Sequence, residues 1–190
     1  MLDTIIAEKW LTANGVIGLF PAASIGDDIE VYADESRSTV IHTLRNLRQQ
    51  SEHRAGVPNR CLGDYIAPKS TGVHDWVGGF AVTTGIGCHE RVAAFKKDND
   101  DYNAILLESL ADRLAEAFAE RLHQRVRREF WGYAADEQLD NASLIDEKYR
   151  GIRPAPGYPA CPEHTEKGTL WQLLDAEANT GISLTESYAM

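Results

Sequence analysis

The amino-acid sequence predicts an α+β fold, and three observations predict it. Two short apolar runs are separated by turn-forming residues, a third apolar run covers 76–84, and helical periodicity extends over about 102–131. Short β-like runs joined by a turn form antiparallel hairpins, and a long amphipathic helix buries its apolar stripe against another element. We therefore expect helices packed against an antiparallel sheet.

The N-terminal part of the chain is expected to form a helix followed by a hairpin. Apolar residues at helical spacing predict a short amphipathic helix over 3–11, which closes near Asn14-Gly15. The apolar runs 16–21 and 29–32 flank turn-forming residues at 24–28. These two runs are expected to pair as antiparallel strands.

The middle of the chain is expected to add two more strands. Residues 39–47 fit both a strand and a helix pattern, and their β-branched start favours the strand. Residues 51–69 contain several glycines and prolines and are expected to form a loop. The run 76–84 is the clearest candidate for a central strand, and Gly78-Gly79 within it indicates a bulge or a close backbone approach.

One long helix is expected to be the main helical element. From about 102 to 131, apolar residues recur every three or four positions, and Gly132 stands where helices often end. The resulting stripe consists of Leu107, Leu110, Leu114, Phe118, Leu122, Val126 and Phe130.

Shorter elements are expected near the C-terminus. A helix is predicted over 141–149 with Asn141 as its N-cap, and a last helix over 165–178 with Thr165 as its cap. Residues 182–190 have a strand-like composition with no partner strand after them. Because an unpaired edge strand is a liability in a complete domain, this end indicates a fragment whose next strand is missing.

Composition limits the classes of function. The chain has 190 residues, which suits one domain, and its 43% hydrophobic and 25% charged residues are ordinary for a globular protein. A net charge of −10 argues against nucleic-acid binding, because phosphate backbones repel it. The sequence lacks an apolar stretch of the roughly 18 residues that a membrane span needs, and it lacks a signal peptide. We therefore expect a cytoplasmic protein that binds neither nucleic acid nor membrane.

The cysteines argue against a disulfide framework and a zinc site. Cys61, Cys88 and Cys161 are widely spaced and form no Cys-x-x-Cys pair. Cys161 and His164 have the spacing of two metal ligands, but no second pair accompanies them. We expect no metal ion in this chain.

Residues 153–162 form a loop with four prolines in ten residues. Prolines fix the backbone, so this loop is expected to be stiff before a ligand arrives. Its Arg153 and Tyr158 could hold a small molecule. The alternative is a surface connector whose charge is incidental.

Two charged groups on the long helix each have two interpretations. Carboxylates repeat every fourth residue at Glu108, Asp112, Glu116 and Glu120. This acidic strip is either a solvated face or a site for a ligand with an ammonium or sulfonium group. Near the end of the helix lie Arg121, Arg125, Arg127 and Arg128. These arginines either stabilise the helix C-terminus or form a docking patch for an acidic partner.

One long segment carries a family resemblance. Residues 151–167 read GIRPAPGYPACPEHTEK. Further segments with the same resemblance are 9–15, 18–22, 26–32, 47–50 and 111–120. Together they resemble the activation domain of cobalamin-dependent methionine synthase, the C-terminal domain that binds S-adenosylmethionine. The resemblance covers essentially the whole chain and implies an α+β fold with a bent antiparallel sheet and packed helices.

The resemblance also implies a ligand site, with no catalytic residue in this chain. Arg153 matches an arginine that contacts S-adenosylmethionine, Ala155 a residue that meets the ligand through its backbone, and Tyr158 a tyrosine beside it. Glu116 matches a helical glutamate of that site, and Asp112 lies one turn before it. A guanidinium suits the ligand's carboxylate, and a carboxylate suits its cationic end.

The implied function is a reactivation module of methionine synthase, a methyltransferase of methionine biosynthesis. In that family, cobalamin sometimes oxidises to inactive cob(II)alamin. The activation domain then presents S-adenosylmethionine, while flavodoxin or a related flavoprotein reductase supplies an electron. Cobalamin is bound by a neighbouring domain, and zinc only by a domain absent here, so this chain is not expected to transfer methyl groups alone.

The resemblance bears on domain organisation as well. The family's domain starts before Met1 and continues past Met190. Residues 1–190 are therefore expected to be a single activation domain that is truncated at both ends. The alternative is a non-catalytic interaction remnant that no longer binds S-adenosylmethionine.

Overall fold

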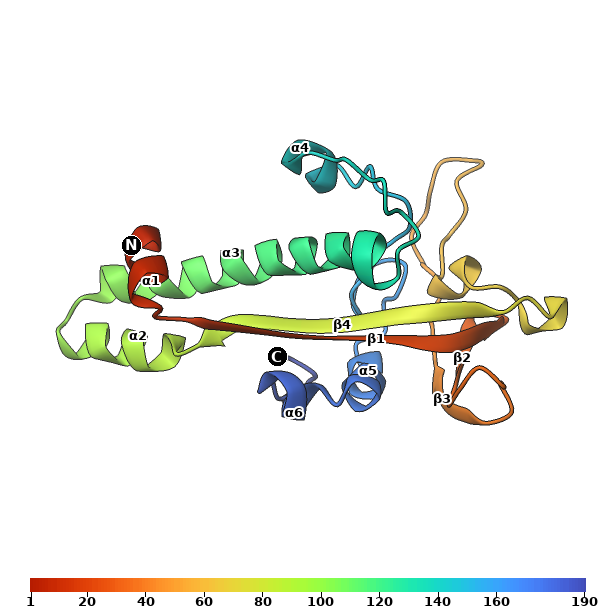
Figure 1. The fold of residues 1–190 in the computed structure, drawn as a ribbon, viewed down its shortest axis with the longest axis horizontal. Coiled ribbons are helices and arrows are strands. Elements are labelled where there is room, and N and C mark those ends of the chain that lie inside the picture. The colour runs from red at the N-terminus through yellow and green to blue at the C-terminus, as the bar shows by residue number, and fades with distance from the viewer. The chain divides into compact units, whose positions relative to one another are not determined.

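The computed structural model describes residues 1–190. Its helices and strands are labelled in Figure 1. In chain order they are α1 (Leu2–Glu8), β1 (Thr12–Ile25), β2 (Asp28–Tyr32), β3 (Val40–Leu44), the 3-10 turns η1 (Leu62–Tyr65) and η2 (Lys69–Thr71), β4 (Asp75–Ile86), α2 (Cys88–Lys97), α3 (Asp101–Arg125), the π-helical turn η3 (Val126–Phe130), α4 (Asn141–Ile145), α5 (Glu166–Leu174) and α6 (Ala176–Thr180). None of these helices is long and apolar enough to cross a lipid bilayer.

The chain divides into two compact units. Unit 1 comprises Met1–Val16, Ala81–Gly151 and Asn179–Gly181, and unit 2 comprises Ile17–Phe80, Ile152–Ala178 and Ile182–Met190. The chain passes from one unit to the other within β1 and again within β4.

The predicted hairpin is confirmed, but the part of β1 that pairs with β2 is 22–25 and not the predicted run 16–21. Strands β1 and β2 pair antiparallel, from Ala22 opposite Val31 to Ile25 opposite Asp28. The turn is shorter than predicted, because Gly26 takes a positive φ of 68° and reverses the chain within two residues. Strand β3 pairs antiparallel with β2, which confirms the choice of a strand within 39–47.

Strand β4 lies at the edge of the sheet. The strand order is β3-β2-β1-β4, so the strand predicted at 76–84 is confirmed but its central position is wrong. Local composition predicts a strand, whereas strand order depends on pairing between distant segments. The close approach predicted at Gly78-Gly79 is confirmed for Gly79, where an added Cβ would lie 2.5 Å from Leu170 Cδ1.

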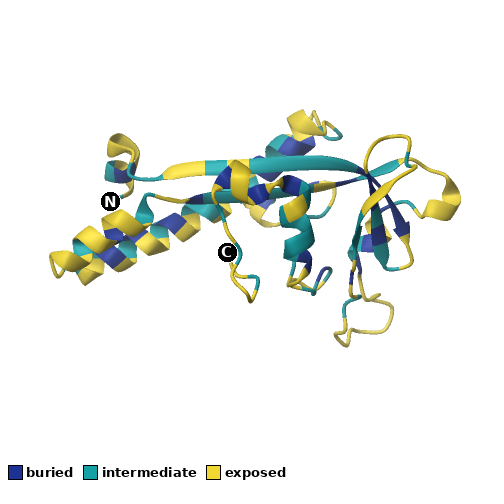
Figure 2. Ribbon diagram, turned by 90° about the horizontal axis from the view of Figure 1, so that it is seen from below, coloured by how far each residue is buried: buried dark blue, intermediate teal, exposed yellow.

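Each unit has its own hydrophobic core, whose buried residues are dark blue in Figure 2. The core of unit 2 consists of Ala22, Ile29, Val31, Ile66 and Val77. The core of unit 1 consists of Ile5, Val92, Ala104 and Leu107, from α1, α2 and α3. In unit 1 the Thr84 hydroxyl of β4 also donates to the Ala111 carbonyl of α3 at 2.7 Å, which joins strand and helix.

Helix α1 ends earlier than predicted. Lys9 takes a left-handed conformation (φ 53°), and its N–H caps the helix on the Ile5 carbonyl. Asn14 and Gly15 then lie inside β1, so the prediction that they close the helix is wrong. The helical stretch predicted at 3–11 otherwise agrees with α1.

The long helix is confirmed, with a change of helical type near its end. Helix α3 starts at an Asp100 cap and continues as the π-helical turn η3, before Gly132 at a φ of 76°. In a π-helical turn the backbone hydrogen bonds span five residues and not four, so its residues no longer face the same direction as the apolar stripe of the α-helix before it. Phe130, the last residue of the predicted stripe, is accordingly 44% exposed, whereas Leu107 and Leu122 are buried.

The short helices differ from their predicted bounds and caps. Helix α4 is capped by Asp140, whose Oδ1 accepts from the Ser143 N–H at 2.8 Å, and not by Asn141. The last helix is interrupted at Asp175, which takes a left-handed conformation (φ 45°) between α5 and α6. Thr165 stands before α5 but makes no cap, because its hydroxyl donates to the Glu163 carboxylate at 2.8 Å.

The strand predicted at 182–190 is not formed. The segment closes on itself through Thr185 N–H to the Ala189 carbonyl (2.8 Å) and Tyr188 N–H to the Thr185 carbonyl (2.9 Å). Side chains of α5 hold it in place: Lys167 donates to the Tyr188 carbonyl at 2.9 Å and Trp171 to the Ile182 carbonyl at 3.0 Å. A strand-like composition therefore does not produce a strand where side chains satisfy the backbone.

Candidate functional site

The proline-rich segment forms an ordered loop, called here the site loop (residues 152–161 of unit 2). Its backbone bonds to itself at three points: Tyr158 N–H to the Ala155 carbonyl (3.0 Å), Gly157 N–H to the Cys161 carbonyl (2.7 Å) and Cys161 N–H to the Tyr158 carbonyl (2.8 Å). These bonds close a tight turn around residues 155–161. The prediction of a loop without helix is confirmed.

Gly157 is required at the tip of this turn for two reasons. Its φ is 108°, a conformation that other residues adopt only with strain. A Cβ added to Gly157 would also overlap the imidazole ring of His164. Glycine therefore lets the loop pack directly on the segment that leads into α5.

The C-terminal end of the site loop is anchored on other parts of unit 2. Leu62 N–H of η1 donates to the Ala160 carbonyl at 3.0 Å, and the Cys161 thiol lies 3.9 Å from the Asn46 Oδ1 that accepts from it. Burial, with a smaller contribution from the nearby Glu166 carboxylate, raises the pKa of the Cys161 thiol to about 11. Cys161 is therefore a protonated, structural thiol at neutral pH.

Three of the four predicted ligand residues lie together on the site loop. Arg153 is half-buried, Ala155 is exposed and Tyr158 is 62% exposed. The loop therefore carries a cation, an exposed alanine and an exposed aromatic residue within six residues. Their contact with a ligand stays a prediction.

The fourth predicted residue, Glu116, lies in unit 1 on α3 and is exposed. Of the acidic strip, Glu108, Asp112 and Glu116 are exposed, and Glu120 is half-buried. Glu108 pairs with Lys96 of α2 at 3.8 Å. Glu116 is therefore one of several accessible carboxylates. Both interpretations of the acidic strip, a solvated face and a site for a cationic ligand, require this accessibility.

The four arginines do not form one exposed patch. Arg127 is fully buried and pairs with Glu137, so its place in a docking patch is wrong. Arg125 pairs with Glu129 at 2.8 Å, and Arg121 donates to the Gln124 side chain. Because most of these charges have partners within unit 1, the arginines stabilise this end of the helix and its following loop.

Sequence reasoning missed a buried carboxylate at the start of α5. Glu166 is only 8% exposed, and its Oε2 has no hydrogen-bond partner. Burial raises the pKa of Glu166, while hydrogen bonds from the Arg45 backbone and the Thr169 hydroxyl lower it less strongly. The sequence does carry one signal for this burial, because Glu166 is spaced four residues from Leu170 and belongs to the same face of the helix.

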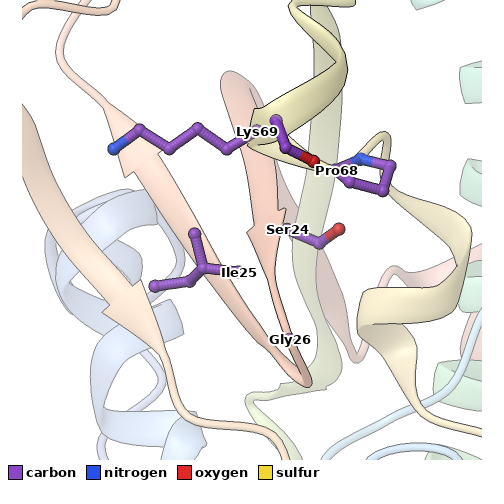
Figure 3. A pocket seen from close by; sticks show the side chains of 6 residues that line it. Ser24, Ile25, Gly26, Pro68 and Lys69 are labelled. Carbon is purple, nitrogen blue, oxygen red and sulfur yellow. The ribbon is translucent and has the colours of Figure 1, made fainter.

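A depression of about 540 Å³ lies in unit 2 between the end of β1 and the 68–70 segment. Figure 3 shows the residues that line it. Two of its polar side chains already have partners within the protein. The Ser24 hydroxyl donates to the Ile66 carbonyl at 2.9 Å, and Lys69 pairs with Glu30 at 2.6 Å. This depression offers a ligand no unpaired charge.

The structure contains no group of three or more His, Cys, Asp or Glu side chains that could hold a metal ion. All three cysteines are free thiols, and Cys61 and Cys161 are buried. His164 is exposed beside Gly157, and the Cys161 thiol turns to Asn46.

Comparison with known proteins adds to this geometry. The family model described as "Vitamin B12 dependent methionine synthase, activation domain" matches residues 1–190. Among solved structures, the chain is similar to one described as "Crystal Structure of the MetH Reactivation Domain bound to AdoHcy", with 58% sequence identity and a TM-score of 0.95. The similarity covers 100% of this chain and 58% of that chain. The resemblance and the α+β fold class predicted from the sequence are both confirmed.

Proposed function

Because the chain belongs to the family of activation domains of vitamin B12-dependent methionine synthase, we propose that it binds S-adenosylmethionine and supports the reductive remethylation of inactive cob(II)alamin. The observation that carries this proposal is the similarity, over the whole chain, to a reactivation domain bound to AdoHcy. AdoHcy is S-adenosylmethionine without its methyl group, so one site can hold the amino-acid and nucleoside groups of both.

The site loop fits such a ligand. The planar fork of Arg153 suits the ligand's carboxylate, and it can donate two parallel hydrogen bonds. Ala155 and Tyr158 are both exposed. The internal hydrogen bonds of the loop reduce the cost of ordering it when the ligand binds.

Glu116 is proposed as the partner of the ligand's cationic end. It lies in a strip of like charges four residues apart, and each such pair repels by ~0.2–0.5 kcal/mol. A sulfonium or ammonium group near Glu116 would replace this repulsion with attraction. The acidic strip then has a binding role in addition to solvation.

The proposal gives this chain one part of the activity of methionine synthase. Its residues hold and orient the methyl donor, and cobalamin, bound by a neighbouring domain, would supply the cobalt that accepts the methyl group. When the methyl group leaves, the sulfur keeps both electrons of the broken bond, so the acceptor must supply both electrons of the new one. Cob(II)alamin would be one electron short, and flavodoxin or a related flavoprotein reductase would supply that electron. We expect no methyl transfer by this chain alone, and we expect the cobalamin-binding domain as its partner in the cytoplasm.

Calorimetric titration with S-adenosylmethionine tests the proposal. Arg153→Ala should weaken binding at least tenfold, about 1.4 kcal/mol, and Arg153→Lys should weaken it less. Arg150→Ala is the matched control, because this exposed arginine is three residues away and should leave affinity unchanged. Equal affinities for the wild type and Arg153→Ala would remove Arg153 from the site.

A second variant tests the acidic strip. Glu116→Gln should weaken binding while the ligand-free protein is as stable or slightly more stable, because repulsion from Asp112 and Glu120 is relieved. Glu108→Gln, in the same strip, serves as the control. A wild-type protein that does not bind S-adenosylmethionine would favour the alternative of an interaction remnant.

A further inference from the structure

Arg48 is the centre of an ion-pair network that the proposed site does not include. Its guanidinium donates to both oxygens of Asp64 (Nη1 to Oδ2 at 2.8 Å, Nη2 to Oδ1 at 2.7 Å) and to Asp27 Oδ1 at 2.6 Å. Nη1 also donates to the Asn59 carbonyl at 2.8 Å. One side chain therefore joins the β1–β2 turn, the segment before η1 and η1 itself.

The network fixes the position of η1. The same Asp64 carboxylate accepts from the Cys61 N–H at 3.0 Å, which closes the first turn of η1. The hydrogen bonds from Arg48 lower the pKa of Asp64, so the carboxylate is charged at neutral pH. Gly63 packs directly on the Asp27 carbonyl, where an added Cβ would lie 2.7 Å from the oxygen.

Two routes lead from this network to the site loop. The first is the Leu62 N–H of η1, which donates to the Ala160 carbonyl at 3.0 Å. The second is Asn46, which donates to the Asp27 carbonyl at 3.2 Å and accepts from the Cys161 thiol at 3.9 Å. Both routes stay within unit 2 and both end at the C-terminal end of the loop.

We propose that Arg48 is a positioning residue for S-adenosylmethionine binding: it holds η1 and the β1–β2 turn together, and these two anchors set the conformation of the site loop. The proposal rests on the proposed function for its ligand. A bidentate arginine suits this role because its rigid fork contacts two carboxylates at once, whereas a lysine ammonium binds them as a point charge. Arg48 lies more than a hundred residues before the loop and touches none of the proposed ligand contacts.

The test compares three variants of the full chain by calorimetry with S-adenosylmethionine and by amide hydrogen exchange without ligand. Arg48→Ala should lower the affinity at least fivefold and speed exchange of the Leu62, Gly157 and Cys161 amides. Arg48→Lys should recover part of both effects. Arg45→Ala is the matched control, because Arg45 pairs with Asp28, the first residue of β2, at 2.6 Å but does not reach η1; it should change neither measurement.

A double-mutant cycle separates positioning from a general loss of stability. If Arg48 acts through the site loop, its effect should shrink in the Arg153→Ala background. There, adding Arg48→Ala should lower the affinity less than twofold, because the ligand contact that Arg48 positions has already been removed. Additive effects, or equal effects of Arg45→Ala, would overturn the proposal. Should Arg48→Ala not fold, Arg48→Lys carries the same test with smaller expected changes.

The two proposals can fail separately. If the wild type does not bind S-adenosylmethionine, the proposed function fails, and the exchange measured without ligand still tests the positioning role. If the wild type binds and loop exchange is the same in Arg48→Ala, the positioning role fails while the proposed function stands.

Discussion

Arg127 is a fully buried arginine whose charge is satisfied on several sides within unit 1. Its Nε and Nη2 donate to the two oxygens of Glu137 at 2.8 and 2.7 Å, and its Nη1 lies 2.7 Å from His123 Nδ1. The guanidinium also stacks over the Tyr149 ring at 4.1 Å. Because an arginine only donates, His123 accepts at Nδ1 and carries its proton on Nε2. This cluster fastens the loop after α3, up to Tyr149, onto the helix.

Breaking this buried ion pair should be costly. Glu137→Gln keeps the size of the side chain but leaves the Arg127 charge uncompensated, and removing one partner of a buried pair typically costs ~3–5 kcal/mol. Urea denaturation of the variant should therefore show a large loss in the free energy of unfolding. Glu129→Gln is the control, because its pair with Arg125 is exposed and one helical turn apart, and such pairs contribute about 0.3–0.5 kcal/mol. Losses of similar size in the two variants would contradict the assignment.

At the scale of elements, local patterns predicted what local forces determine. The β1–β2 hairpin, α3 and the proline-rich loop follow from turn residues, helical periodicity and proline content, and all three are confirmed. The edge position of β4 and the absence of a strand at 182–190 depend on which distant groups satisfy the backbone. The spacing of apolar residues within one segment cannot show which distant groups its backbone will bond to.

The candidate site shows the same division. Arg153, Ala155 and Tyr158 are neighbours in the sequence, so their placement on one loop was predictable. The supports of the loop were not, because Arg48 and Asn46 reach it only through contacts formed by folding. The sequence gives only a weak indication that Arg127 is buried. His123 and Arg127 are four residues apart, next to the apolar stripe of the long helix.

The N-terminus of α5 should give the domain a measurable pH dependence through Glu166. Burial raises the folded-state pKa of Glu166 above its ordinary value of 4.5. The folded state therefore binds more protons than the unfolded state above pH 4.5, and stability falls as the pH rises from 4.5 through the raised pKa. Glu166→Gln removes this titration, so its stability relative to the wild type should increase from pH 4.5 to pH 7.

A neighbouring carboxylate provides a control of opposite sign. Hydrogen bonds from the Thr165 backbone and hydroxyl lower the pKa of Glu163. Its stabilising effect is present above pH 4.5 and is lost as the pH falls through the lowered pKa, so Glu163→Gln should lose stability relative to the wild type as the pH rises through the lowered pKa to 4.5, and should change little from pH 4.5 to pH 7. Denaturant titrations at several pH values measure both trends. A Glu166→Gln difference that does not change with pH would show that the carboxylate titrates normally, because the cost of a buried amide is constant with pH.

At the scale of the whole molecule, two cores are linked by continuous strands. Each unit buries its own cluster, around Ile29 and Val31 in unit 2 and around Leu107 in unit 1. Strands β1 and β4 each run from one unit into the other without a break. Loss of order in one unit removes hydrogen-bonded strand from the other, so the two units should unfold in one cooperative transition.

This coupling predicts that a cavity in one core weakens both units. Leu107 is fully buried, and Leu107→Ala should cost ~2–5 kcal/mol through lost burial and the cavity that remains. Hydrogen exchange under mildly destabilising conditions should then speed up for the amides of β2 in unit 2 as well as for those of α3. Ile105→Ala, on the same helix but 62% exposed, should change stability by less than about 0.5 kcal/mol and leave β2 protected. If Leu107→Ala speeds exchange in unit 1 alone, the shared strands do not couple the units, and each core folds on its own.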